Sequence, residues 1–104
     1  MQLYRRGSND VVGNLGLGDI QMASARTTLA RKLNDLLAEM NLSQTEAAEL
    51  LGIPQPKISA IRNYRLEGIS LERLMEALTA LGQRVEIKVS PSNGRIPARI
   101  QVAA

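Results

Sequence analysis

The sequence predicts a mainly α-helical fold of about four to five short helices, followed by one β-strand near the C-terminus. Two patterns indicate the helices: apolar residues recur at steps of three and four, and helix-capping residues stand where those runs begin and end. A third pattern indicates the strand, because apolar and charged residues alternate over residues 84–89. A chain of 104 residues is enough for one small domain with flanking tails. We expect an arm at 1–18, a domain at 19–89 and a tail at 90–104.

The first eighteen residues are rich in glycine and asparagine and lack periodicity, which is typical of a loop or a loosely docked arm. Three glycines, Gly13, Gly16 and Gly18, suggest a nucleotide-binding loop. Their spacing is GxxGxG rather than GxGxxG, no Lys-Ser/Thr pair follows, and no βαβ pattern surrounds them. The sequence therefore does not predict a phosphate-binding loop.

The first helix is predicted from Asp19, a suitable N-cap, to about Met40. Apolar residues at 29, 33, 36 and 40 follow steps of four, three and four, which places them on one helical face. The helix is interrupted at Asn41-Leu42. The second helix is predicted over 44–51.

The segment "SQTE" marks the start of the second helix. Ser43 and Glu46 have the spacing of a capping box, in which each side chain accepts a hydrogen bond from the backbone N–H of the other residue. Gly52 follows the helix and can adopt the positive φ that ends it.

The segment "GIPQPKIS" predicts a third helix over 56–63. Proline lacks the N–H that the first turn of a helix leaves unpaired, so Pro56 suits the first helical position. The residue before a proline favours an extended backbone, which makes Gln55 the expected N-cap. Pro54 then stiffens the turn that sets the angle between the second and third helices.

The fourth helix is predicted to begin after Ser70, an N-cap residue, and to end at Gly82. Its apolar face consists of leucines at i, i+3, i+7 and i+10: Leu71, Leu74, Leu78 and Leu81. The strand at 84–89 comes next and needs a partner for its backbone. The partner is either the tail segment "ARIQV" or the same strand of a second subunit. Pro97 stands directly before that segment and interrupts the return of the chain, so pairing across a two-fold axis is favoured.

The positive charge is concentrated in one part of the chain. The formal net charge is +3, and residues 52–66 contain Lys57, Arg62 and Arg65 without any acidic residue. A local basic patch on an otherwise balanced domain is typical of a surface that binds a polyanion. The alternative is an ordinary solvated face, and charge alone does not separate the two.

The composition excludes most catalytic sites. The chain has no Cys and no His, so cysteine nucleophiles, disulfides, histidine-based triads and thiolate or imidazole metal sites are absent. The carboxylate pairs Asp35 with Glu39 and Glu46 with Glu49 have the spacing of solvated helix faces. We therefore predict no enzyme and no cofactor. No apolar run approaches the ~18 residues of a membrane span, and no signal peptide is evident, which predicts a cytoplasmic protein without a membrane partner.

The second and third helices, joined by a glycine-containing turn, have the organisation of a helix-turn-helix motif. With Ile58 and Ile61 directed inward, the third helix presents a polar outer side that contains no glutamate. Four residues point outward on that side: Pro56, Ser59, Ala60 and Asn63. An ordinary helical hairpin in a bundle is the alternative, but such a surface helix usually carries acidic residues as well.

Two segments, "LSQTEAAELLGIPQPKISAIRN" and "GISLERLMEALTALGQRVEIKV", closely resemble Xre-type helix-turn-helix proteins and in particular the HigA-like antitoxin branch. The resemblance covers about residues 10–89, and the upstream "DVVGNLGLGD" resembles the leader segment of that branch. It implies a lambda-repressor-like fold. Two positions depart from the family pattern: Pro54 replaces a usual Ser or Thr, and Tyr64 replaces the glycine after the third helix. Asn63 is expected to supply the left-handed residue there.

In such a fold the third helix enters the major groove of DNA and the second helix crosses the backbone. The resemblance implies that Gln44 contacts a phosphate, with helix capping as its alternative role. Gln55 is the expected base reader, because its amide can bond an adenine edge twice. The expected DNA-binding residues are Gln44, Gln55, Pro56, Lys57, Ser59, Ala60, Arg62, Asn63 and Arg65.

These DNA-binding residues divide into base contacts and phosphate contacts. Ser59 can donate or accept a hydrogen bond, whereas Pro56 and Ala60 offer only apolar contact, for example with a thymine methyl group. Lys57, Arg62 and Arg65 are expected to lie against phosphates. Base reading is therefore limited, and the shape of the operator carries part of the specificity.

Two functions fit this reading best. The first is the antitoxin of a toxin–antitoxin pair, which represses its own operon as a homodimer on a palindromic operator and neutralises a small basic toxin, by resemblance a RelE-like ribonuclease. The second is a stand-alone or phage-type Xre repressor. A protein-interaction module that has lost DNA binding is a third possibility, against which the glutamine, serine and basic residues of the third helix argue.

Overall fold

The computed structural model describes residues 17–104, of which residues 17–80 contain all the helices. The predicted arm, apart from its last two residues, lies outside the described residues, and so do Gly13 and Gly16. The helices follow one another along the chain as α1 (Leu17–Glu39), α2 (Gln44–Leu51), α3 (Gln55–Arg62) and α4 (Leu71–Ala80). The mainly α-helical prediction is confirmed for the described part of the chain.

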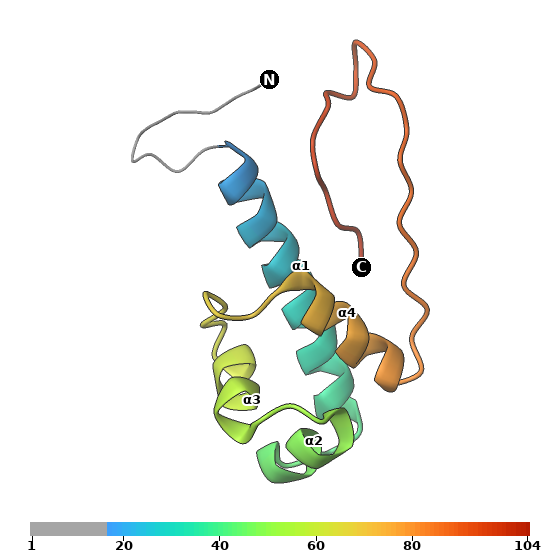
Figure 1. Ribbon diagram of the computed structural model, residues 1–104. Helices are drawn as coiled ribbons and strands as arrows, with labels where there is room; N and C mark the ends of the chain where they lie inside the picture. The colour runs from blue at the N-terminus through green and yellow to red at the C-terminus, as the bar shows by residue number, and fades with distance from the viewer. Residues whose placement is uncertain (1–16) are drawn as a thin grey trace.

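The long helix α1 is the support on which the others are arranged (Figure 1). Its 23 residues span about 34 Å at the usual helical rise. Helix α4 packs along α1, while α2 and α3 pack against each other near the C-terminal end of α1. The chain after α4 runs outward in an extended conformation and returns beside the N-terminal half of α1. There the backbone N–H of Ile100 donates to Oε1 of Gln21 at 3.1 Å.

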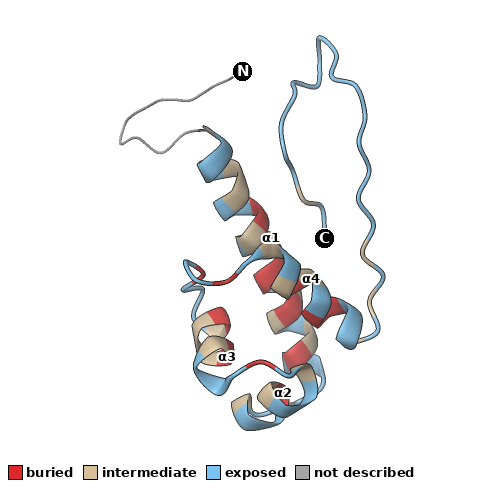
Figure 2. Ribbon diagram, in the orientation of Figure 1, coloured by how far each residue is buried: buried red, intermediate tan, exposed pale blue. Residues whose placement is uncertain are grey.

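The core lies where all four helices meet and is entirely apolar among the described residues. Helix α1 contributes Leu29, Leu33 and Leu37 to it, whereas Leu36 is only partly buried and Met40 is exposed. The predicted apolar face of α1 is therefore confirmed at Leu29 and Leu33 and wrong at Met40. The buried face continues through Leu37, which the prediction did not include. Figure 2 shows the buried residues on the facing sides of the helices. The buried residues that form the core cluster are Leu29, Ala30, Leu33, Leu37, Ala47, Ile53, Ile58, Ile61, Leu66, Ile69, Leu74, Ala77 and Leu78.

Local signals determine where most helices begin and end. The predicted capping box is confirmed: the N–H of Glu46 donates to Oγ of Ser43 at 3.1 Å, and the N–H of Ser43 donates to Oε1 of Glu46 at 2.9 Å. Ser70 caps α4 by accepting a hydrogen bond from the N–H of Arg73. Helix α1 begins at Leu17, two residues before the predicted start, so Asp19 lies in the first turn, where a carboxylate is also favoured.

Gly52 ends α2 with a φ of +66°, as predicted, and this backbone conformation is the reason for a glycine there. A Cβ at Gly52 meets no atom within 4 Å, so only the backbone conformation penalises a side chain. We expect Gly52→Ala to lower the free energy of unfolding by about 1–2 kcal/mol in urea denaturation.

Gly68→Ala is the matched control for Gly52→Ala. Gly68 also has open space around its Cβ position and has no positive φ, so we expect no loss of stability there. Equal losses in the two variants would contradict the role assigned to Gly52.

The start of α3 differs from the prediction. The N-cap is Pro54 and not Gln55: its carbonyl accepts hydrogen bonds from the N–H groups of Lys57 at 2.9 Å and Ile58 at 3.1 Å. Gln55 is the first helical residue, and Pro56 occupies the second position. This arrangement is possible because the N–H groups of the first two helical positions have no intrahelical acceptor, so Pro56 removes no helical hydrogen bond at either position.

The end of α3 also differs from the prediction. Asn63 has a φ of −103°, and the left-handed residue is Tyr64, with a φ of +58°. The N–H of Tyr64 donates to the carbonyl of Ile61 at 3.1 Å, and that of Arg65 donates to the carbonyl of Ala60 at 2.8 Å. These two bonds form a Schellman motif, which requires the left-handed conformation at the position of Tyr64 regardless of the side chain.

The predicted strand at 84–89 is not formed in the single chain. Residues 83–93 are extended, but no residue of the described chain belongs to a strand or a bridge. A strand needs a neighbour that pairs its N–H and C=O groups, and the returning tail lies along α1 instead of beside this segment. The tail segment "ARIQV" is therefore not its partner within the chain.

Candidate nucleic-acid interface

Helix α3 is attached to the core by one face and leaves the other accessible. Ile58 and Ile61 are buried, as predicted, and they pack in the cluster that α1 and α4 complete. Gln55 and Pro56, in the first turn, are exposed, whereas Ser59 and Ala60 are partly exposed. The outer side of α3 therefore presents its exposed N-terminal end, pale blue in Figure 2, and the partly exposed Ser59 and Ala60.

Two side-chain hydrogen bonds with residues outside the helical hairpin fix the C-terminal end of α3. Nδ2 of Asn34, on α1, donates to the carbonyl of Ile61 at 3.1 Å. Nη2 of Arg62 donates to the carbonyl of Leu42, in the α1–α2 connection, at 3.1 Å. Both groups are partly buried, so these bonds orient α3 relative to α1.

Sequence reasoning missed Asn34. Its acceptor lies 27 positions further along the chain, and no local pattern connects the two. The available signal was a polar residue beside Leu33 and Leu37, at the edge of the buried face of α1. Such a residue needs a partner, which only the tertiary arrangement identifies.

The predicted phosphate contacts occupy three different environments. Lys57 is partly exposed, and its Nζ lies 3.4 Å from the carbonyl of Gly68, a long contact that leaves the ammonium able to move. Arg65 is exposed, just after the end of α3. Arg62 is partly buried and held by Leu42. Lys57 and Arg65 are thus the cations of α3 and its exit that can reach a ligand with least rearrangement.

Two further predicted residues, Asn63 and Gln44, lie at helix ends. Asn63 is exposed, and its Nδ2 donates to the carbonyl of Ser59 at 2.9 Å, so its amide is engaged with the last turn of α3. Gln44 is the partly exposed first residue of α2. Ser43, not Gln44, caps α2, so the capping role considered for Gln44 is not needed.

The structure brings the predicted residues onto two adjoining helices. Eight of them lie between Gln55 and Arg65 on α3 and its exit, and Gln44 begins α2, which packs directly against α3. No charged residue is fully buried among the described residues, and exposed Arg65 and partly exposed Lys57 remain in contact with water until a ligand approaches. The N-terminal end of α3 adds the positive end of its helix dipole to the charge of Lys57. The surface is suited to a polyanion.

The capping box of α2 lowers the pKa of one carboxyl group at the edge of this surface. The pKa of Glu46 lies below its usual 4.5, because the backbone N–H of Ser43 donates to the carboxylate, with a smaller contribution from the Ser43 hydroxyl. A lowered pKa means that ionised Glu46 stabilises the fold above pH 4.5 and that this contribution disappears as the pH falls through the lowered value.

The pH dependence of stability tests this capping box. Glu46→Gln keeps an acceptor oxygen for the Ser43 N–H but cannot be titrated. We expect the native chain to lose more stability than Glu46→Gln when urea denaturation is repeated at successively lower pH from neutrality. Identical pH profiles for the two proteins would contradict the assignment.

A metal site and a membrane span are both absent from residues 17–104. No group of three or more His, Cys, Asp or Glu side chains in this part of the chain is placed to hold a metal ion. The same residues contain no helix that is long and apolar enough to cross a bilayer.

Comparison with known proteins agrees with the helical hairpin and its exposed second helix. A family described as a helix-turn-helix domain matches residues 11–90. A solved structure named "Putative XRE Family Transcriptional Regulator" is similar, with 48% sequence identity and a TM-score of 0.77. The similarity covers 83% of this chain and 98% of that chain. No curated protein matches the sequence.

Proposed function

The chain belongs to the Xre-type helix-turn-helix family of DNA-binding transcriptional regulators, and on that premise we propose that it is the antitoxin of a type II toxin–antitoxin pair. In this role it represses its own operon and neutralises a small basic toxin of the RelE-like class. The observation that carries the DNA-binding part is the exposed, acid-free N-terminal end of α3. The antitoxin part is supported by the resemblance of residues 10–89 to the HigA-like branch.

We propose that α3 enters the major groove with Gln55 at base edges. Gln55 is exposed in the first turn, and its neutral amide can pair with an adenine. Ser59, Ala60 and Pro56 supply the remaining base contacts. Asn34 and the bond of Arg62 to Leu42 keep α3 at a fixed angle to α1, which favours one docking geometry.

The cations position the protein on the DNA backbone in this proposal. Lys57 and Arg65 contact phosphates, and Gln44 presents the start of α2 to another. Arg62 adds to the positive electrostatic potential of this surface while its guanidinium remains bonded to the carbonyl of Leu42. One short recognition helix covers only a few base pairs, so a homodimer on a palindrome with half-sites about 34 Å apart is the fitting assembly.

Lys57→Ala separates positioning from reading. We expect its affinity for operator and random duplexes to fall by similar factors, about tenfold each, because an ammonium near a phosphate adds affinity without reading sequence. Arg31→Ala, an exposed cation on α1, is the charge-matched control and should bind like the native chain. Fluorescence anisotropy titrations on both duplexes measure this. A loss confined to the operator would make Lys57 a base reader.

Two experiments in cells test the biological role. A reporter fused to the DNA upstream of the coding sequence should be repressed by the native chain. The adjoining reading frame should arrest growth when it is expressed alone and should lose this effect when the chain is co-expressed. Repression without such a neighbour would favour the second candidate, a stand-alone or phage-type repressor.

A further inference from the structure

Tyr64 has a backbone conformation that does not suit its side chain. Its φ is +58°, in the left-handed region, where a bulky side chain is strained. Residues 17–104 contain three other positive φ angles, at Asn41, Gly52 and Gly82. Glycine and asparagine tolerate this conformation, so only at Tyr64 do residue type and backbone disagree in the described chain.

The packing of the domain does not account for the tyrosine. Tyr64 is 46% exposed, and it belongs neither to the core cluster nor to the partly buried residues that pack against that cluster. Its hydroxyl group has no hydrogen-bond partner within residues 17–104. The ring therefore does not offset the cost of the left-handed backbone. Residues held in strained conformations are concentrated at ligand-binding sites, which makes Tyr64 a candidate for a ligand contact.

Tyr64 lies in the surface that carries the accessible cations. It directly follows the cap residue of α3 and precedes the exposed Arg65. The α3–α4 connection begins here and projects from the helical body beside α3 (Figure 1). Nζ of Lys57 lies 3.4 Å from the carbonyl of Gly68, in the same connection. The tyrosine therefore belongs to a segment that both accessible cations border.

The hydrogen bonds that end α3 fix the position from which the Tyr64 side chain starts. The N–H of Tyr64 donates to the carbonyl of Ile61 at 3.1 Å, and the N–H of Arg65 donates to the carbonyl of Ala60 at 2.8 Å. These bonds hold the backbone on both sides of the Tyr64 Cα. A tyrosine side chain has only two rotatable χ angles, so it loses little conformational entropy when it contacts a ligand.

The chemistry of a phenol fits the sugar–phosphate backbone of DNA. The hydroxyl group can donate a hydrogen bond to a phosphate oxygen, and the ring offers an apolar face to a deoxyribose. Base edges fit less well, because they are reached from the N-terminal end of a recognition helix, whereas Tyr64 follows the C-terminal end of α3. The neighbouring Arg65 supplies a positive charge that attracts a phosphate to this position.

We propose that Tyr64 binds the DNA backbone where α3 ends, with its hydroxyl group donating to a phosphate oxygen and its ring against the adjoining deoxyribose. Arg65 contacts the same stretch of backbone through its charge. The hydrogen bond from the tyrosine is neutral, so it adds affinity without releasing a counterion. The inference rests on the proposed function only in the docking of α3 in the major groove. Tyr64 thus raises DNA affinity and lowers the stability of the fold.

Salt-dependent titrations separate the neutral contact from the charged one. Tyr64→Phe lacks only the hydroxyl group, and we expect it to bind the operator and a random duplex about tenfold more weakly with an unchanged log–log salt slope. Arg65→Gln should also bind more weakly, but its slope should flatten by about 2 for a dimer, because each subunit loses one phosphate contact. A loss in Tyr64→Phe that is confined to the operator would overturn the backbone contact.

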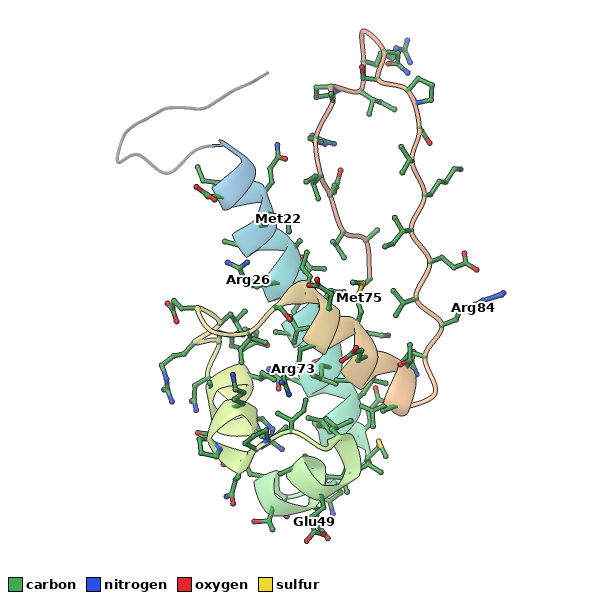
Figure 3. The ribbon with its side chains drawn as sticks, in the orientation of Figure 1. Met22, Arg26, Glu49, Arg73, Met75 and Arg84 are labelled. Carbon is green, nitrogen blue, oxygen red and sulfur yellow. The ribbon has the colours of Figure 1, made fainter. Side chains whose placement is uncertain are left out.

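Arg84→Gln is the matched control for Arg65→Gln. Arg84 is also exposed, but its side chain points outward beyond the end of α4, away from α3 (Figure 3). We expect its affinity and its salt slope to equal those of the native chain. Equal flattening in both arginine variants would mean that net charge alone sets the slope, which would overturn the place of Arg65 in this contact.

The thermal stability of Tyr64→Gly tests the inference without DNA. Glycine adopts the left-handed conformation without strain, and the exposed ring contributes little to the core. We therefore expect Tyr64→Gly to melt at a temperature no lower than that of the native chain, while its DNA affinity falls at least as far as that of Tyr64→Phe. A structural role for the ring predicts a lower melting temperature, and that result would overturn the inference.

The outcomes distinguish this contact from the proposed function. If the native chain binds its own upstream DNA and Tyr64→Phe binds it equally tightly, the contact is refuted and the proposed function stands. If the native chain binds neither duplex, the docking of α3 and the contact are both refuted. If the Tyr64 variants behave as expected but the adjoining reading frame encodes no toxin, the contact stands and the antitoxin role is refuted.

Discussion

Leu33→Ala is expected to lower the free energy of unfolding by about 2–5 kcal/mol, the largest stability effect that we predict for a single substitution. Leu33 is completely buried in the middle of α1, the helix on which α3 and α4 both pack. Truncation leaves a cavity at this junction and removes the buried surface that holds the other helices together. Small domains are stable by only about 5–15 kcal/mol, so the loss is a large fraction of the total.

Urea denaturation measures this effect, with Leu50→Ala as the matched control. Leu50 is also a helical leucine, on α2, but it is 49% exposed. We expect that control to lose less than about 1 kcal/mol, because much of its side chain is already in water. Comparable losses in the two variants would mean that the core is not centred on α1.

Gln55→Glu is expected to reduce affinity for the operator about 100-fold without reducing stability. The substitution is nearly isosteric, and a carboxylate in the first turn of α3 interacts favourably with the helix dipole. At the DNA, the substitution removes the amide donor that pairs with an adenine edge, and the phosphates repel the new carboxylate. The effect on stability is therefore neutral or favourable and the effect on DNA affinity is unfavourable, which separates a binding defect from a folding defect.

Two companion variants make the Gln55→Glu experiment specific. Gln55→Ala removes the amide without adding charge and should lose about 1–3 kcal/mol of binding free energy, with relaxed preference at one base pair. Gln83→Glu introduces the same charge just beyond the end of α4 that lies away from α3 (Figure 1) and should bind normally. Thermal denaturation of all three checks the fold. Equal loss on operator and random duplexes for Gln55→Ala would remove Gln55 as a base reader.

The features that the sequence predicted correctly depend on neighbouring residues. Ser43, Glu46 and Gly52 define α2 because a capping box and a left-handed end need only residues within a few positions. Ile58 and Ile61 were assigned to the core because their spacing fits one face of a short helix. The location of the candidate site follows from these same local rules.

The features that sequence reasoning missed depend on backbone closure or on distant partners. Residue type favoured Asn63 as the left-handed residue, but the hydrogen bonds that end α3 place this conformation one residue later, at Tyr64. Asn34 and Arg62 have acceptors on other elements, which no local pattern reveals. The extended segment after α4 has the composition of a strand, but a strand also requires a partner that one copy of the chain does not supply.

The affinity of the native chain for the DNA upstream of its own coding sequence tests the central claim most directly. We propose titrating that duplex and a scrambled one over about 50–200 mM salt. The exposed, acid-free end of α3 predicts tighter binding to the chain's own DNA, with a log–log salt slope near −4 if each subunit of a dimer neutralises about two phosphates through Lys57 and Arg65. Absence of binding at the lowest salt, or equal affinity for the two duplexes, would contradict the account.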